Sequence, residues 1–148
     1  MGTHFLIAVM HESTSVDQTE SIAAEMSARF VGGEVVALQG ELGAGKTQFV
    51  RGLLRGLGGQ PRTVNSPTFV LLNVYDTGRL TLYHLDAYRA AGADDFEAIG
   101  FAELLEQQGV VAVEWPQRVR RLLPAGAWQV HLSAVGESAR RIEIISPP

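Results

Sequence analysis

A lysine and a threonine follow a glycine-rich turn in the stretch GELGAGKT, residues 40–47. Their spacing is that of the phosphate-binding pattern G-x-x-x-x-G-K-[ST]. Glycines let such a loop turn its backbone N–H groups inward, and the helix that follows adds unpaired N–H groups and a positive dipole end. In this pattern Lys46 brings a positive charge to the outer phosphates, and the Thr47 hydroxyl is a Mg²⁺ ligand. The loop therefore predicts nucleotide phosphate binding. We expect Lys46 to point into an open, solvent-filled site when no nucleotide is bound.

A loop of this kind also needs an acid to help organise Mg²⁺, and two carboxylates are candidates. Asp86 ends the run LTLYHLD, and Glu114 ends the run VVAVE. Ligands gather at the carboxyl ends of parallel strands, so both acids lie near the loop if their strands run parallel to the one before it. The structural alternatives are a turn or helix cap for Asp86 and a simple strand-end carboxylate for Glu114. Trp115 fits a core position and a lid beside the nucleotide equally well.

The elements that must position these residues follow from hydrophobic periodicity and turn signals. The pattern predicts a parallel α/β core that antiparallel hairpins interrupt and finish. We therefore expect one P-loop NTPase-like domain over residues 1–148, with a mixed central sheet flanked by helices; the first few residues are not expected to contribute. The predicted strands are 5–9, 34–38 and 109–115, the predicted helices 13–30, 47–57, 93–107 and a short basic one after Pro116, and the predicted hairpins 68–86 and 127–146.

Composition excludes several classes of function. The 148 residues include no cysteine, which excludes disulfides, thiolate metal sites and cysteine nucleophiles. A net charge of −4 does not suggest a broad nucleic-acid-binding surface, so stable DNA binding is not expected. The apolar stretches are shorter than the roughly 18 residues of a membrane span, and the N-terminus lacks a basic leader. A cytoplasmic location is the expectation.

Four segments, in this order and at these spacings, resemble the TsaE family of small bacterial P-loop ATPases. They are GELGAGKTQFVRGLLRGLG, VNSPTFVLLNVY, LYHLDAYR and VEWPQRV with LLP shortly after. The resemblance covers about residues 15–145. Two mild departures lie outside the fixed loop positions: Glu41 replaces a commoner Asp, and Gln48 replaces a frequent Thr.

The resemblance implies a set of site residues. It puts catalysis on Lys46, Asp86 and Glu114, with Thr47, Glu114 and Asp86 as the Mg²⁺ ligands. Thr68 lies in a switch-like loop, residues 66–68, that faces the γ-phosphate. Further nucleotide contacts transfer more weakly to residues 15–19 and to Arg140. The implied nucleotide-binding residues are Glu41, Leu42, Gly43, Ala44, Gly45, Lys46, Thr47, Thr68, Trp115 and Arg140.

The resemblance also implies a role. TsaE-like proteins use ATP and Mg²⁺, release ADP, and act with the TsaB–TsaD complex in the threonylcarbamoyl modification of adenosine beside the anticodon of ANN-decoding tRNAs. In that scheme the ATPase does not perform the transfer, and contact with tRNA is only indirect. Its ATP cycle resets the TsaB–TsaD pair between turnovers.

Three alternatives remain open from the residues themselves. A small-molecule P-loop kinase would need an acceptor pocket and an arginine-bearing lid, for which only residues 117–124 offer a candidate. A GTPase normally carries N-K-x-D, and no NK or TK pair occurs here. A binding module with an inert loop requires that Asp86 and Glu114 are both structural.

Overall fold

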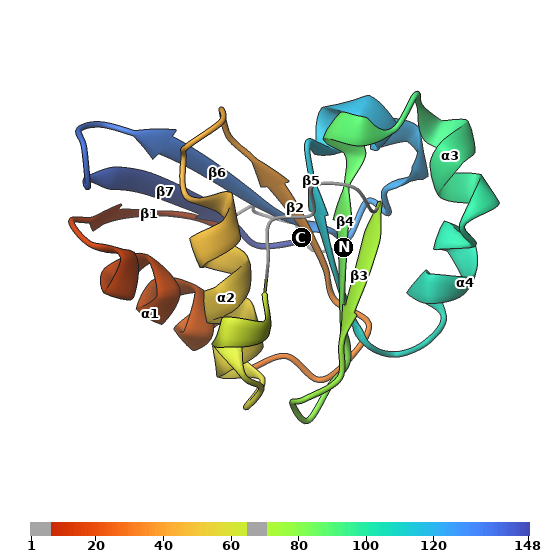
Figure 1. Cartoon of the computed structure of the whole chain (residues 1–148), viewed down its shortest axis with the longest axis horizontal. Helices are drawn as coiled ribbons and strands as arrows, with labels where there is room; N and C mark the ends of the chain where they lie inside the picture. The colour runs from red at the N-terminus through yellow and green to blue at the C-terminus, as the bar shows by residue number, and fades with distance from the viewer. Residues whose placement is uncertain (1–6, 65–70) are drawn as a thin grey trace, which may run out of the picture.

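The computed structural model describes residues 7–64 and 71–148 (Figure 1). Its seven strands form one sheet in the order β1-β7-β6-β2-β5-β4-β3. This is the mixed α/β architecture expected from the sequence. The strands are β1 (Ala8–Ser13), β2 (Val35–Gln39), β3 (Leu72–Tyr75), β4 (Leu82–Asp86), β5 (Val110–Glu114), β6 (Trp128–Ala134) and β7 (Arg140–Ile145).

The centre of the sheet is parallel, and its two margins are antiparallel. Strand β2 pairs in parallel with β5 and β6, and β4 pairs in parallel with β5. Strands β2 and β5 are continuous apolar runs because helices or 3₁₀ turns cover both of their faces. At the margins, β3 pairs antiparallel with β4, and β7 pairs antiparallel with β6 and β1. Both predicted hairpins are therefore present.

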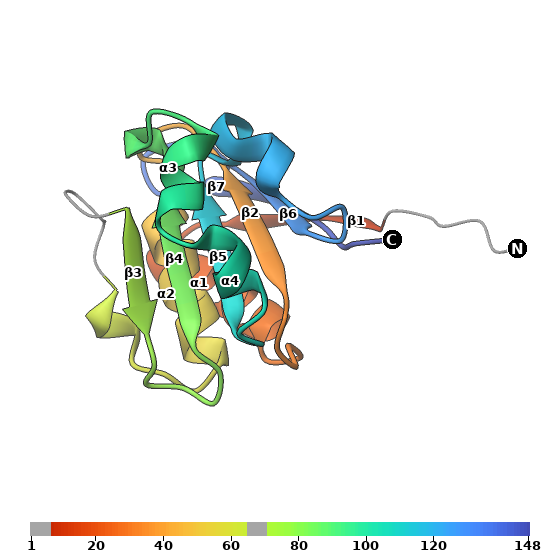
Figure 2. The same ribbon diagram turned by 90° about the vertical axis from the view of Figure 1, so that its right-hand side faces the viewer.

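Helices lie on both faces of the sheet (Figures 1 and 2). Helices α1 (Val16–Ser27) and α2 (Lys46–Gly56) cover one face, where one apolar cluster forms. Helices α3 (Ala93–Ala98) and α4 (Phe101–Leu105) and the 3₁₀ segment η3 (Pro116–Leu122) pack over the other, around a second cluster. Two shorter 3₁₀ turns are η1 (Pro61–Thr63) and η2 (Ala87–Arg89).

Two glycines that lower the helix propensity of α2 allow α1 to pack closely against it. A Cβ on Gly52 would collide with the backbone of Glu20, and one on Gly56 would collide with the Ser27 hydroxyl. Ser27 Oγ donates a hydrogen bond across the contact to the carbonyl of Leu53 at 2.8 Å. The α1–α2 pair thereby fixes where the helix that follows the glycine loop begins.

Four boundaries differ from the sequence prediction by more than one residue. The helix predicted over 13–30 is Val16–Ser27, because Ser13 belongs to β1 and Ser15 caps the helix. Residues 5 and 6 of the predicted strand 5–9 lie outside the described residues; in the described part β1 continues to Ser13, because its partner is β7, whose register places Ser13 opposite Arg140.

The predicted helix 93–107 is two helices, broken at Gly100, which has φ +82°. The basic segment after Pro116 is 3₁₀ rather than α-helical. None of the helices in the described residues is long and apolar enough to cross a membrane.

Candidate nucleotide site

The glycine loop joins the carboxyl end of β2 to the first turn of α2. Gly43 and Gly45 have φ of +81° and +104°, values that L side chains rarely adopt. Gly45 is the residue that caps α2, and its carbonyl accepts a hydrogen bond from the N–H of Phe49 at 2.9 Å. Gly40 is needed for space instead, since a Cβ there would lie 2.7 Å from the carbonyl oxygen of Leu132. The loop thus has the backbone form that a phosphate cradle requires.

The loop residues differ in how open they are to solvent. Glu41, Leu42 and Gly43 are exposed, whereas Ala44 is buried. Thr47 is half-buried in the first turn of α2. The loop is therefore anchored in the fold by its buried residues 44–46, and its exposed residues 41–43 are accessible to a ligand.

Lys46 does not point into an open site, contrary to the sequence expectation. Only 6% of the residue is exposed, and Nζ donates a hydrogen bond to the carbonyl of Gly40 at 2.7 Å. Nζ also lies 3.7 Å from the centroid of the Trp115 ring, a cation–π contact. Burial lowers the pKa of Lys46, and the nearby carboxylates of Glu114, Asp86 and Glu41 oppose that shift. The lysine side chain is therefore held by the backbone of the glycine loop and by the Trp115 ring.

The two candidate acids lie side by side at the carboxyl ends of parallel strands. Asp86 on β4 is directly opposite Glu114 on β5, and Glu114 is opposite Leu38 on β2. Asp86 is 9% exposed and Glu114 5%. Burial raises the pKa of Asp86, the charge of Glu114 raises it further, and a hydrogen bond from the Tyr88 N–H acts against the shift. Two buried acids thus lie beside the lysine at the base of the site.

Asp86 also has the structural role that the sequence left open for it. Its Oδ1 accepts a hydrogen bond from the Tyr88 N–H at 2.9 Å and caps the turn η2. Capping uses one oxygen, so the same carboxylate can serve both roles.

His84 is a site residue that the sequence analysis did not single out. It is fully buried, and its Nε2 lies 2.5 Å from Glu114 Oε2. The available signal was a histidine inside an apolar strand, two residues before Asp86 and so on the same face of β4.

The donor set around Lys46 is suited to Mg²⁺ bound together with phosphates. Two carboxylates and the Thr47 hydroxyl supply hard oxygen ligands. In the described part of the chain no three or more His, Cys, Asp or Glu side chains form a metal site of their own. Mg²⁺ is usually held by one or two carboxylates plus substrate phosphates rather than by an all-protein cage, so the residues present fit it.

Trp115 adopts a strained backbone conformation directly after Glu114. Its φ of 56° and ψ of 50° are left-handed, which is uncommon for a bulky residue. The ring packs on Tyr88, with centroids 5.0 Å apart, and it also contacts Lys46 and the second apolar cluster. Strain of this kind is concentrated at functional sites. The tryptophan ring thus covers the ammonium group of Lys46.

A cavity of about 330 Å³ opens beside the loop on the α1 side. The C-terminal hairpin supplies Arg140, whose guanidinium Nη1 donates to backbone carbonyls of the β6–β7 turn, with distances of 2.9–3.4 Å. The structure thus brings Arg140 and residues 15–19 together at the loop. The residues lining this cavity are Ser15, Val16, Thr19, Gly43, Gly45, Gln48, Glu137, Ser138 and Arg140.

Residues 13–142 match the family described as "Threonylcarbamoyl adenosine biosynthesis protein TsaE". The chain belongs to the TsaE family. Similar curated relatives carry the name "tRNA threonylcarbamoyladenosine biosynthesis protein TsaE". That of Treponema pallidum is 48% identical over 76% of this chain and 82% of its own length, and that of Bacillus subtilis 40% identical over 85% and 78%. The crystal structure of Bacillus subtilis YdiB has a TM-score of 0.80 and 30% identity, covering 99% of this chain and 90% of its own.

One residue implied by the TsaE resemblance, Thr68, lies outside the described residues, as does the rest of the switch-like loop. The other implied residues all border the loop, the acid pair or the cavity beside Arg140. Their roles in binding remain predictions.

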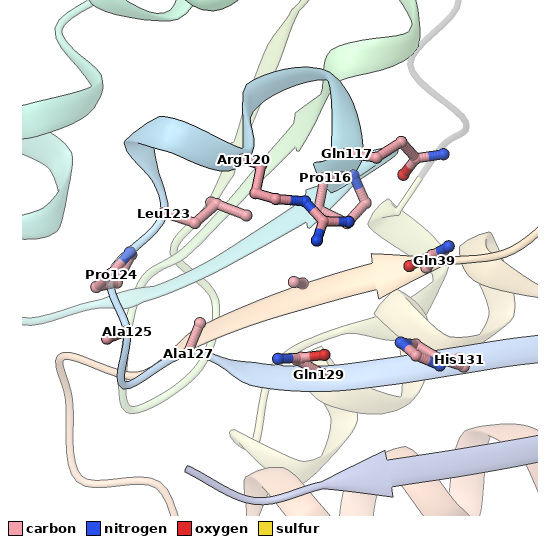
Figure 3. Close-up of a pocket in the computed structure, with 11 residues that line it drawn as sticks. Gln39, Pro116, Gln117, Arg120, Leu123, Pro124, Ala125, Ala127, Gln129 and His131 are labelled. Carbon is pink, nitrogen blue, oxygen red and sulfur yellow. The ribbon is translucent and has the colours of Figure 1, made fainter. Parts of the chain in front are cut away.

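A second pocket, of about 170 Å³, lies between η3 and strands β2 and β6 (Figure 3). Arg120 and Pro116 approach it from η3, while Gln129 and His131 lie on β6. Ala37 and Gln39 line it from β2, and they alternate with Leu38, which packs on the α2 side. The pocket is therefore on the opposite face of the sheet from α2, away from Lys46.

Proposed function

We propose that this protein is a Mg²⁺-dependent ATPase of tRNA threonylcarbamoyladenosine biosynthesis. It acts with the TsaB–TsaD complex, contacts tRNA only indirectly and does not perform the transfer. The role places it in the cytoplasm. Membership of the TsaE family supports the pathway, and the relatives' printed names carry the same process.

The observation that carries the proposal is the meeting of Lys46, Asp86 and Glu114 at one sheet edge. The lysine comes from the loop after β2, and the acids come from the ends of two neighbouring parallel strands. Both acids are among the charges that act on Lys46. An inert loop would not need two buried carboxylates beside its lysine, since their burial costs free energy.

In this proposal the loop and the acids have separate tasks. The backbone N–H groups of residues 41–47 hold the phosphates, and Lys46 exchanges the Gly40 carbonyl for phosphate oxygens. Thr47, Glu114 and Asp86 supply the oxygens that hold Mg²⁺, which would neutralise phosphate charge during transfer. Trp115 must then leave Lys46 or move with it.

We propose adenine rather than guanine selectivity because the chain lacks the guanine-reading N-K-x-D sequence. The cavity beside Arg140 is the proposed place for the nucleoside. A titration should show Mg²⁺-dependent binding of ATP and ADP. Binding of GTP as tight as that of ATP would contradict this part of the proposal.

Two arginines of η3, Arg118 and Arg121, are engaged away from the site, which supports slow turnover by the free protein. Arg118 donates to the carbonyl of Ala90 at 3.2 Å, and Arg121 pairs with Asp94 and Glu97. Arg120 lines the pocket on the far face. A well-placed arginine accelerates phosphoryl transfer by about 10³- to 10⁵-fold where a partner supplies it.

The test is a steady-state ATPase assay with and without the matching TsaB–TsaD pair. We expect the free protein to turn over ATP well below about once per second, because Arg118 and Arg121 are engaged away from the site, and we expect the pair to accelerate it. Typical kinases and activated GTPases, by comparison, reach about 1–100 per second. Fast hydrolysis that the pair leaves unchanged would contradict the resetting role. Phosphorylation of a small molecule would favour the alternative of a P-loop kinase, although the pocket with Arg120 lies on the wrong face of the sheet.

A further inference from the structure

We propose that His84 is a positioning residue that orients Glu114 for Mg²⁺ binding. The inference rests on the proposed function, because it assigns Glu114 to the cation. It concerns a side chain that does not itself touch nucleotide or metal.

The fold brings His84 to Glu114 across two neighbouring strands. His84 is opposite Ala112 in the parallel β4–β5 pair, and Glu114 is two residues further along on the same face of β5. Ala112, the residue opposite His84, has only a methyl side chain. The Tyr75 ring, 6.2 Å from that of His84, packs on the side of β3.

The chemistry of the contact determines which atom donates. As a ligand of a cation Glu114 would be ionised, and an ionised carboxylate only accepts hydrogen bonds, so the proposal requires a proton on the facing Nε2. Nδ1 of His84 is buried and reaches no hydrogen-bond partner within residues 7–64 and 71–148. A single hydrogen bond, from Nε2–H to Glu114 Oε2, therefore accounts for the polar contact of this buried ring.

That hydrogen bond occupies one oxygen of Glu114 and leaves the other for a cation. Among the described residues Oε2 has this bond from His84, and none reaches Oε1. Groups that hydrogen-bond to metal-ligating carboxylates fix their orientation, and their loss typically costs about 10- to 100-fold in metal affinity. His84 should act in this way on Glu114.

Three variants separate positioning from burial. In His84→Gln the amide nitrogen is as many bonds from the backbone as Nε2 of histidine, so it can still donate to Glu114. In His84→Asn the amide nitrogen is at the position of Nδ1 and cannot reach. His84→Leu removes the donor entirely. Asn and Gln carry the same amide group into the core, so a difference in Mn²⁺ affinity between these two variants shows whether the donor must reach Glu114.

The readout is Mn²⁺ binding, followed by electron paramagnetic resonance, with ADP present so that no turnover is needed. We expect His84→Asn and His84→Leu to weaken Mn²⁺ binding by about 10- to 100-fold and His84→Gln to retain most of it. ADP binding in EDTA should change little in any variant. Equal Mn²⁺ affinity in all three variants would overturn the inference. So would a loss in Gln as large as in Asn.

Two further measurements complete the test. The first uses a double variant, and the second uses the unmodified protein and so does not depend on whether any variant folds. In the Glu114→Gln background, His84→Asn should have no additional effect on Mn²⁺ binding, because the histidine acts through that carboxylate. In the unmodified protein, ¹⁵N NMR of histidine should show a proton on Nε2 of His84; a bare Nε2 overturns the inference. If the unmodified protein binds no Mn²⁺ with ADP, the proposed function fails instead.

Discussion

Strands β4 and β5 present two different faces to their neighbours. The face toward α2 carries apolar residues at its start and His84, Asp86 and Glu114 at its carboxyl end. The opposite face, toward α3 and α4, carries Tyr83 and otherwise apolar residues. Its residues Leu85, Val111 and Val113 are at most 2% exposed and pack on Phe96 and Phe101.

The difference shows how one pair of strands serves stability and chemistry at once. Side chains alternate along a strand, so neighbouring residues such as His84 and Leu85 enter different environments. His84 and the two acids are gathered on one face, where His84 contacts Glu114 and the charges of both acids act on Lys46. The other face holds the strands in place through apolar burial. Substitutions on the two faces should therefore have separable effects.

The largest expected effect is that of Lys46→Ala. Removing the charge that faces the phosphates should abolish measurable ATP hydrolysis and weaken triphosphate binding. The fold should persist, because Lys46 belongs to neither apolar cluster and its direct contacts are the Gly40 carbonyl and the Trp115 ring. Radioactive ATPase assays and far-ultraviolet circular dichroism check both parts. Loss of helical signal would indicate a structural role for this lysine.

Asp86→Asn and Glu114→Gln should each lower hydrolysis by about 10²-fold, the usual cost of one electrostatic group in a catalytic site. Both substitutions keep the shape of the side chain, so thermal unfolding should change far less than activity. Activity is measured over a range of Mg²⁺ concentrations. A variant that hydrolyses ATP at the parental rate would remove that residue from the site.

Leu85→Ala should have the reverse profile, and it is the matched control because Leu85 lies between His84 and Asp86 in the chain. Truncating a fully buried leucine costs about 2–5 kcal/mol of unfolding free energy. Mg²⁺-dependent nucleotide affinity, measured well below the melting temperature, should stay within a factor of about three, a shift of less than 1 kcal/mol. Urea denaturation and nucleotide titration test the two halves, and a large loss of affinity would show that the faces are coupled.

The smallest expected effect is a pH-dependent gain in stability for metal-free Asp86→Asn. Burial raises the pKa of Asp86, so the folded state disfavours its ionised form. The contribution of this carboxyl to stability is thus full below the unfolded pKa near 3.8 and is lost as pH rises through the folded pKa. Asparagine keeps an acceptor for the Tyr88 N–H. Urea denaturation in EDTA should show that the unfolding free energy of the variant rises relative to that of the parent as pH increases from 3 to 7. The absence of such a rise would contradict the desolvation argument.

Local chemistry made much of the site predictable. The glycine spacing identified the loop, since positive φ and close backbone approach at Gly43, Gly45 and Gly40 are requirements that few other residues meet. Apolar runs that end in Asp86 and Glu114 identified the acids. The break at Gly100 and the 3₁₀ form of residues 116–122 escaped prediction, because short helices depend on packing more than on propensity.

The sequence by itself determined the phosphate loop, the strands other than β1 and the residues that share each strand face, because these depend on nearest neighbours and on side-chain alternation. Only the tertiary structure decided that β4, β5 and β2 are adjacent and parallel, which makes Asp86 and Glu114 neighbours. The His84–Glu114 hydrogen bond and the Trp115 ring over Lys46 join residues 30 and 69 positions apart. Such contacts arise from strand order and register, which long-range burial selects and no local pattern encodes.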